Sequence, residues 1–361
     1  MPHPYQSLPP DRFWRSGVAD IPPLEIAGLW QPKFRIRRRS RIVTAGSCFA
    51  QHFSRALVAR GYNWMDYEPG PAGLTAAQRS DYNYGVFSFR TGNIYTPRML
   101  RQWLTWAFGG GPVSEEVWQT EGRFYDPFRP AIEPDGFASA DEVLAARQQT
   151  LAALRAAVKG AQVFVFTMGL TEAWQNRETG VEYAVCPGTI AGDFDPDRHV
   201  FVNHRFSALL ADLGVALRIM FRQNRSLNVL LTVSPVPLTA TASGQHVLSA
   251  TSHSKSLLRA VAAEATEGRA NVDYFPSYEI ITHPAYRGMF FAPNQRSVLP
   301  EGVDHVMKTF FADQAAQFAP DEAAPAILAD SPVAPDDAAE DETAEDELRC
   351  EEAILNAFAP R

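Results

Sequence analysis

The stretch RIVTAGSCFA, residues 41–50, decides how the chain begins to fold. Its apolar, β-branched first half is typical of a strand buried on both faces, and the pattern that follows over 48–60 predicts a helix with one apolar face. Gly46 permits a tight turn between the two. Because backbone N–H groups gather at the start of a helix and stabilise negative charge, Ser47 or Cys48 at this turn is a candidate nucleophile.

Both side chains also have a purely structural interpretation. Ser47 is of a residue type that caps helix N-termini, and Cys48 behaves as a small hydrophobe when it is buried. The local pattern alone therefore leaves catalysis and helix capping open.

The alternation of strand and helix continues along the chain. Two further continuous apolar runs, 162–169 and 228–235, resemble the first, and a fourth strand is predicted at 272–280. Helical patterns occur at 48–60, 97–108, 140–159, 205–221, 254–267 and 303–314. This alternation predicts an α/β fold with a central parallel sheet and helices on both faces. We expect the interrupting segments 63–95, 110–135 and 174–204 to be inserted loops at the carboxyl ends of the strands, where ligands bind.

The composition is that of an ordinary globular protein, with 361 residues, 46% hydrophobic and 20% charged. No apolar run approaches the roughly 20 residues of a membrane span, and the N-terminus is polar and proline-rich, so we expect a cytoplasmic protein. Cys48, Cys186 and Cys350 are too few and too widely spaced for a disulfide framework or a zinc site. We expect no metal, no cofactor and no nucleic-acid partner, because the chain shows none of the corresponding motifs.

Charge and composition divide the chain into an N-terminal extension at 1–34, one domain at 35–318 and an acidic tail at 319–361. The tail holds thirteen Asp and Glu against two Arg and is rich in Ala and Pro, so we predict that it is largely disordered. Its end, ELRCEEAILNAF (347–358), predicts either a short amphipathic helix that docks on the body or on a protein partner, or a frayed end.

The sequence also resembles a known family. The blocks that carry the resemblance are GSCFA (46–50), NYGVFSF (83–89), GNIYTPRML (92–100), FTMGLTEAW (166–174), TVSPVPLTATA (232–242) and YFPSYEI (274–280). Together they resemble the GSCFA-domain family, a bacterial family that is distantly similar to the GDSL/SGNH hydrolases, over roughly 35–315. The resemblance implies a three-layer flavodoxin-like (SGNH-like) fold and ester chemistry.

The resemblance also implies roles for single residues. An ungapped match of the superfamily's Gly-Asp-Ser-Leu to 46–49 puts Cys48 at the nucleophile and Ser47 at the aspartate, and Ser47 remains the alternative nucleophile. Thr171 stands where the superfamily has its oxyanion asparagine, with a hydroxyl that can donate one hydrogen bond. The residues expected to bind the oxyanion or the ligand are Gly46, Asn83, Gly92, Asn93, Gly169, Thr171, Asn294 and Arg296.

The superfamily's catalytic acid and base are missing, because its Asp-x-x-His reads Asn294-Gln295-Arg296-Ser297 here. His52, four residues after the candidate thiol and on the same helix face, and His305, in the last predicted helix, are the histidine candidates. Glu172 is a carboxylate candidate just past a strand. The other histidines, His204, His246, His253 and His283, are candidates by position only. Arg296 is of a residue type that anchors carboxylates and phosphates.

We therefore expect an ester hydrolase or O-acyltransferase of SGNH type, acting on a small-molecule or carbohydrate ester such as an O-acylated polysaccharide. The alternative is a non-catalytic ligand-binding protein on the same fold, because loss of the acid and base removes orders of magnitude in rate. The acidic tail adds the expectation of a protein partner.

Overall fold

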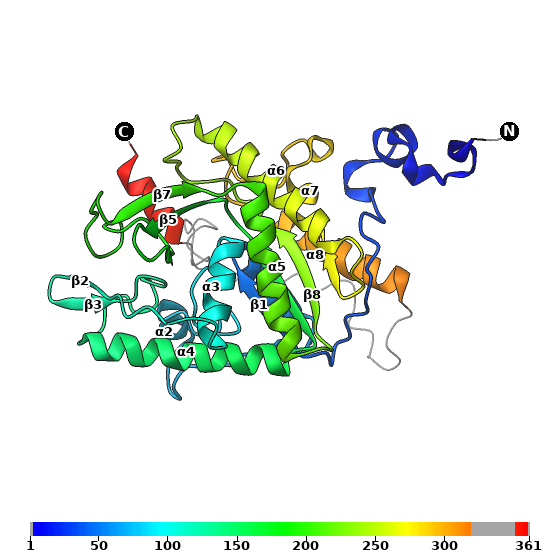
Figure 1. The fold of residues 1–361 in the computed structure, drawn as a ribbon. Coiled ribbons are helices and arrows are strands. Elements are labelled where there is room, and N and C mark those ends of the chain that lie inside the picture. Colours follow the sequence, from blue (N-terminus) through cyan, green and yellow to red (C-terminus); the bar gives the residue numbers. More distant parts are fainter. Residues whose placement is uncertain (1–2, 319–350, 360–361) are drawn as a thin grey trace.

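The computed structural model describes residues 3–318 and 351–359, and its centre is a parallel sheet (Figure 1). The strands are β1 (Ile42–Gly46), β4 (Val163–Met168), β8 (Asn228–Val233) and β9 (Val272–Tyr274), in the order β1-β4-β8-β9. A single parallel bridge between Ile42 and Trp64 extends the sheet beyond β1. With this bridge the order becomes that of a flavodoxin-like, doubly wound sheet.

The fourth strand is shorter than the predicted 272–280. It ends at Tyr274, and helix α7 (Ser277–Thr282) begins three residues later. Pro276 lies between the two, and a proline has no N–H to donate to the next rung of a strand ladder. The prediction of a strand was right for the first three residues of this stretch and wrong for the rest.

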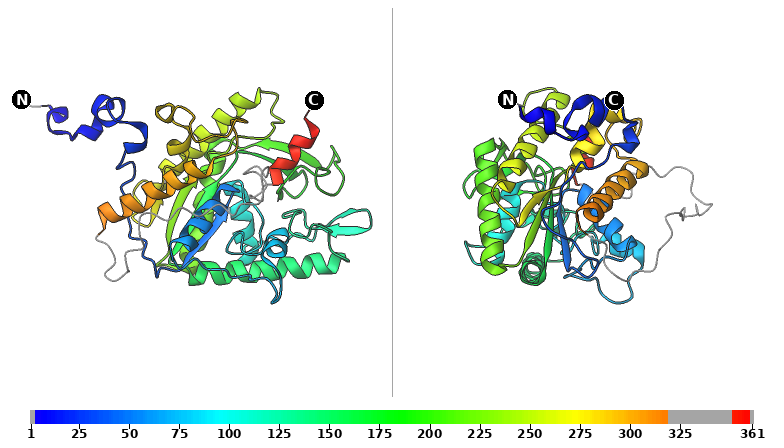
Figure 2. Two further views of the ribbon diagram at one scale, coloured as in Figure 1. Left: turned by 180° about the vertical axis from the view of Figure 1, so that it is seen from behind. Right: turned by 90° about the vertical axis from the view of Figure 1, so that its right-hand side faces the viewer.

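Helices cover both faces of the sheet and make three layers (Figure 2). One face carries α3 (Pro97–Ala107), α4 (Ala140–Gly160), α5 (Phe206–Gln223) and α6 (Val247–Thr266). The other face carries α1 (Phe49–Ala59), α7 and α8 (Pro300–Gln317). The two faces have separate apolar cores because successive strand residues point to opposite sides, so that Val43 and Phe164 belong to the first core and Ile42 and Val163 to the second. The predicted three-layer α/β fold is confirmed.

The inserted segments, which were predicted to be loops, contain regular secondary structure. They form α2 (Ala76–Asp81), a hairpin of β2 (Trp118–Thr120) and β3 (Arg123–Tyr125), and a three-stranded antiparallel sheet in the order β6 (Glu182–Tyr183), β5 (Glu172–Asn176), β7 (His199–Asn203). The strands of this small sheet mix charged, amide and aromatic side chains. They therefore lack the alternation that marks a strand in a sequence.

The ends of the chain lie outside the sheet. Residues 4–25 form the short helical turns Pro4–Ser7, Pro10–Arg12, Arg15–Ala19 and Pro23–Glu25, at the opposite end of the molecule from the β2–β3 hairpin (Figure 2). The 3₁₀ helix η6 (Glu351–Phe358) lies beside β5 (Figure 1). The predicted disorder of 319–350 lies outside the described residues. Across the parts of the chain that are described, no helix is both long enough and apolar enough to cross a bilayer.

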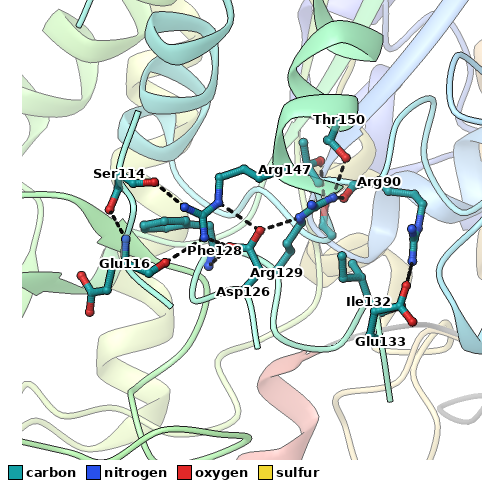
Figure 3. A network of polar contacts seen from close by, with 12 residues as sticks. Arg90, Ser114, Glu116, Asp126, Phe128, Arg129, Ile132, Glu133, Arg147 and Thr150 are labelled. Atoms are coloured by element: carbon teal, nitrogen blue, oxygen red, sulfur yellow. Dashed lines mark hydrogen bonds and ion pairs between the residues drawn. The ribbon is translucent and has the colours of Figure 1, made fainter. Parts of the chain in front are cut away.

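A buried ion network fastens one insertion to the body (Figure 3). The carboxylate of Asp126 accepts hydrogen bonds from Arg129 Nε at 2.8 Å and from Arg147 Nη2 at 2.9 Å, and all three side chains are fully buried. Arg129 also donates to the carbonyl of Arg90 at 2.9 Å and to the hydroxyl of Thr150. The network thereby joins the 126–129 turn and α4 to the loop that leads into the candidate site.

Candidate functional site

The turn after β1 can be built only with glycine. Gly46 has φ +134°, and a Cβ there would lie 2.3 Å from the carbonyl oxygen of Thr167 on the neighbouring strand. The N–H of Ser47 donates to that same carbonyl at 3.0 Å, so β1 and β4 stay paired up to the turn. The turn therefore lies between the carboxyl ends of β1 and β4, where the strand order reverses and doubly wound folds bind their ligands.

Ser47 faces the loop that follows β4. Its side chain is only 2% exposed, and within the described residues its Oγ makes no hydrogen bond. A Cβ added to Gly169 would lie 2.9 Å from Ser47 Cβ and 3.0 Å from the ring of Tyr95. A buried hydroxyl without a partner is uncommon and calls for an explanation.

Cys48 belongs to a different environment. It is the residue before α1 and is buried in the apolar cluster on the α1 and α8 side, together with Phe49 and Phe53. The two candidate nucleophiles thus differ in surroundings: Ser47 adjoins the loops at the strand ends, whereas Cys48 lies within an apolar core.

The loop around Asn93 closes over the turn. Gly92 has φ +64°, and the next residues bring the buried Asn93 beside β1, because the N–H of Ile94 donates to the carbonyl of Gly46 at 2.8 Å. The carbonyl of Tyr95 then accepts from the N–H of Gly169 at 2.8 Å. The structure therefore brings together the Gly46, Ser47, Asn93 and Gly169 that the sequence singled out.

Thr171 is engaged with neighbouring residues. Its hydroxyl donates to Asn203 Oδ1 at 2.8 Å, and its N–H donates to Ser254 Oγ at 3.0 Å. Because a hydroxyl has one proton to donate, Thr171 would have to break the bond to Asn203 before it could stabilise an oxyanion.

A buried lysine lies at the same loop and was missed by the sequence analysis. Lys255, on α6, is 1% exposed, and its Nζ donates to the carbonyl of Gly169 at 2.7 Å. The only signal in the sequence was a lysine three residues before Leu258, on the apolar face of a helix. Lysines are almost never fully buried unless the ammonium or amine group is paired or hydrogen-bonded.

Neither predicted histidine pairs with an acid in the described part of the chain. His52 packs edge-on against Phe49, and burial first, with the charge of Arg55 second, lowers its pKa to about 4. His305 packs against Phe290 and Tyr286, and burial lowers its pKa too. Both rings are therefore expected to be neutral at pH 7.

Residues 294–297, which stand in place of Asp-x-x-His, form hydrogen bonds with one another. Asn294 Nδ2 donates to Ser297 Oγ at 2.8 Å, and Asn294 Oδ1 accepts from the N–H groups of Arg296 and Ser297 at 3.0 and 2.9 Å. These contacts are those of an Asx turn. Asn83, another predicted ligand-binding residue, donates to the carbonyl of Ala131 and so holds an insertion in place.

A cavity of about 490 Å³ adjoins the site and contains two carboxylates. Glu172 accepts from the hydroxyl of Thr241 at 2.7 Å, and burial raises its pKa although this hydrogen bond opposes the shift. Glu182 is buried, accepts from Thr96, and lies 2.8 Å from Nε2 of His204. In the described residues this is the histidine that pairs with a carboxylate. His204 was a candidate by position only, and Glu182 was not singled out.

The described residues contain no cluster of three or more His, Cys, Asp or Glu side chains that could hold a metal ion. The polar groups at the turn and at the neighbouring loop after β4 are a hydroxyl, an amide and a buried lysine nitrogen. Such groups are suited to binding a carbonyl group and transferring a proton.

Comparison with known proteins agrees with the resemblance seen in the sequence blocks. The model of the GSCFA family matches residues 41–310, from the start of the strand that leads into the turn to a point within α8. Neither the curated proteins nor the solved structures include a significant match to the chain. Because the matched segment holds the parallel sheet, helices of both layers and the Ser47 turn, the chain belongs to the GSCFA family.

Proposed function

We propose that this protein is an ester hydrolase or O-acyltransferase in which Ser47 is the nucleophile and Lys255 the proton acceptor. The observation that carries the proposal is the Ser47 hydroxyl, which is buried at the reversal of strand order and makes no hydrogen bond within the described residues. Ser47 is preferred to Cys48 because the thiol lies in an apolar cluster, whereas the hydroxyl adjoins the loop that Lys255 contacts.

The chemistry follows from these positions. Lys255, as a neutral amine, accepts the hydroxyl proton while Ser47 Oγ bonds to the ester carbonyl carbon, and the C=O electron pair moves to the carbonyl oxygen. The side chain of Asn93, a candidate for part of the oxyanion site, is the group that we assign to that oxyanion, because the Thr171 hydroxyl already donates to Asn203. The bond to the leaving alcohol then breaks, and the alcohol takes the proton from Lys255. Water, or a second alcohol in a transferase, then gives its proton to Lys255 and bonds to the acyl carbon. The bond from that carbon to Ser47 Oγ breaks, and Ser47 takes the proton back from Lys255.

The test is active-site labelling of the full chain. A fluorophosphonate and, separately, iodoacetamide are added, and the modified residue is identified by mass spectrometry. We expect the fluorophosphonate on Ser47, no adduct in S47A, and labelling in K255M that is slower by about 10²-fold or more, which is the usual contribution of a general base. K308M, a change at an exposed lysine of α8, is the control and should label at the normal rate.

A second candidate is a ligand-binding protein without catalysis. The observation in its favour is that Asn294 and Ser297, at the positions of the missing acid and base, hydrogen-bond to each other. Absence of selective labelling at both Ser47 and Cys48 would favour this candidate. Selective reaction of Cys48 with iodoacetamide, with no reaction at Ser47, would assign the nucleophile to the thiol instead.

A further inference from the structure

The cavity beside the site has mostly apolar walls. Six of its large side chains come from α3, the loop after β4 and the small antiparallel sheet with its flanking residues: Met99, Leu170, Trp174, Tyr183, Val185 and Phe201. Its volume of about 490 Å³ lies within the range of small-molecule sites. Tyr95 and Leu170 line the cavity, and Tyr95 also contacts the turn through Gly169. Through Tyr95 and the loop at Gly169, the cavity therefore adjoins the turn that holds Ser47.

The charged groups of the cavity are all acidic. Glu172 and Glu182 line it, and among the described residues no lysine, arginine or histidine does. Glu182 is already satisfied by Thr96, Gln175 and His204, and Glu172 by Thr241. A ligand that carried a carboxylate or a phosphate into this space would lose its hydration and meet like charge without a counterion. The cavity consequently disfavours anions.

The C-terminal segment forms one wall. Leu355, Asn356, Phe358 and Ala359 line the cavity, although they belong to the far end of the chain from its other walls. Phe358 is still 63% exposed, so it covers the cavity without being part of the core. Figure 1 shows η6 lying along β5.

We propose that this cavity binds the uncharged apolar acyl group of the ester, and that residues 355–359 form its outer wall. The identification of the ligand as an ester rests on the proposed function, whereas the binding of an uncharged apolar group does not.

The first test measures binding without any reaction. N-phenyl-1-naphthylamine is uncharged and apolar, and 1-anilinonaphthalene-8-sulfonate is a similar probe with a negative charge. We expect saturable binding of the uncharged probe at one site per chain, with quenching of tryptophan fluorescence through Trp174, and at least tenfold weaker binding of the sulfonate. E172Q, which removes one of the two negative charges, should reduce the difference in affinity between the two probes. Equal binding of the two probes, or no binding of the uncharged one, would overturn the proposal.

The second test fills the cavity. Ala240 is an exposed loop residue that lines it, so A240W should weaken binding of the uncharged probe about tenfold without disturbing the core. A72W, at an exposed loop alanine that does not line the cavity, is the matched control and should bind normally. If A240W binds the probe as tightly as the unchanged protein, the probe site lies elsewhere and the proposal fails.

The third test addresses the C-terminal wall in the full chain. The double change L355S and F358S should weaken probe binding several-fold and speed probe release, whereas A357S, a change on the same segment at a residue that does not line the cavity, should do neither. Unchanged binding in the double variant would refute the role of the segment.

The last comparison separates the two proposals. S47A should bind the uncharged probe normally and turn over no ester. If the probe binds but neither p-nitrophenyl hexanoate nor p-nitrophenyl acetate is cleaved, the ester function fails and the apolar site stands. If Ser47 is labelled but A240W lowers kcat/KM equally for the hexanoate and the acetate, the ester function stands and the acyl assignment of the cavity fails.

Discussion

Replacing Asp126 by asparagine should be one of the most damaging single changes in this protein. The carboxylate is fully buried and takes hydrogen bonds from two buried guanidinium groups, those of Arg129 and Arg147, and from the N–H of Phe128 at 3.1 Å (Figure 3). Asparagine keeps the shape but removes the charge and turns an N–H₂ group toward donors. Two arginine side chains are then left in the interior without their counterion.

The size of the effect follows from that geometry. Breaking a buried ion pair by removing one partner costs about 3–5 kcal/mol, and here one carboxylate serves two cations. A typical domain has a free energy of unfolding of only about 5–15 kcal/mol. At roughly 2–4 °C per kcal/mol for a domain of this order of size, the melting temperature of D126N should fall by about 6–20 °C.

The assays are thermal unfolding followed by circular dichroism, which gives the melting temperature, and urea unfolding followed by tryptophan fluorescence, which gives the free energy of unfolding. D20N is the control, because Asp20 forms an exposed ion pair with Arg15, and it should leave the unfolding midpoint unchanged. Burial by itself would raise the pKa of Asp126, but Arg147 and Arg129 outweigh it and lower the pKa below its ordinary value. The stabilisation is therefore complete above about pH 4, the pKa of an unfolded aspartate, and is lost as the pH falls through the lower folded pKa.

Two results would refute this reasoning. The first is a D126N protein that is destabilised by less than about 1 kcal/mol, which is the size of an ordinary hydrogen bond. The second is a difference between the two proteins that already shrinks between pH 7 and pH 5, since this would mean that the pKa of the carboxyl is raised rather than lowered.

Three further changes test the turn and its surroundings. G46A should lower the free energy of unfolding by more than about 3 kcal/mol, because both the backbone angle and a 2.3 Å contact forbid a side chain. G61A, at a glycine with positive φ but open space, should lower it by only about 1–2 kcal/mol. Equal urea midpoints for the two variants would contradict this. G169A places a Cβ against Ser47, so fluorophosphonate labelling should be lost in a protein that still melts cooperatively, and normal labelling would count against the site. The pKa of His52 is about 4 in the folded protein against an ordinary 6.5, so the unfolded chain binds a proton that the folded chain does not, and the free energy of unfolding falls as the pH drops from about 6.5 to about 4. In urea titrations at a series of pH values, H52Q should show a weaker pH dependence than the unchanged protein. An unchanged dependence would exclude His52 as its source.

Local pattern was enough to predict the framework. The runs 41–46, 162–169 and 228–235 are continuous and β-branched because their strands are buried on both faces, and burial leaves a direct trace in composition. A strand that is only partly buried does not show this composition. An example is β5, whose sequence EAWQN does not predict an antiparallel sheet. A proline in the middle of 272–280 was the available signal for the early end of β9.

The sequence by itself determined the parallel α/β fold, the GSCFA family and the position of the turn at Gly46 and Ser47, because each depends on residues that are adjacent along the chain. Only the tertiary structure decided which polar groups meet beside that turn and in the cavity that adjoins it. Lys255 reaches the loop after β4 from a helix distant in sequence, and Glu182 meets His204 across an inserted sheet. A buried lysine and a solvated one look alike in a sequence, since what distinguishes them is the packing of segments that crossover connections bring together.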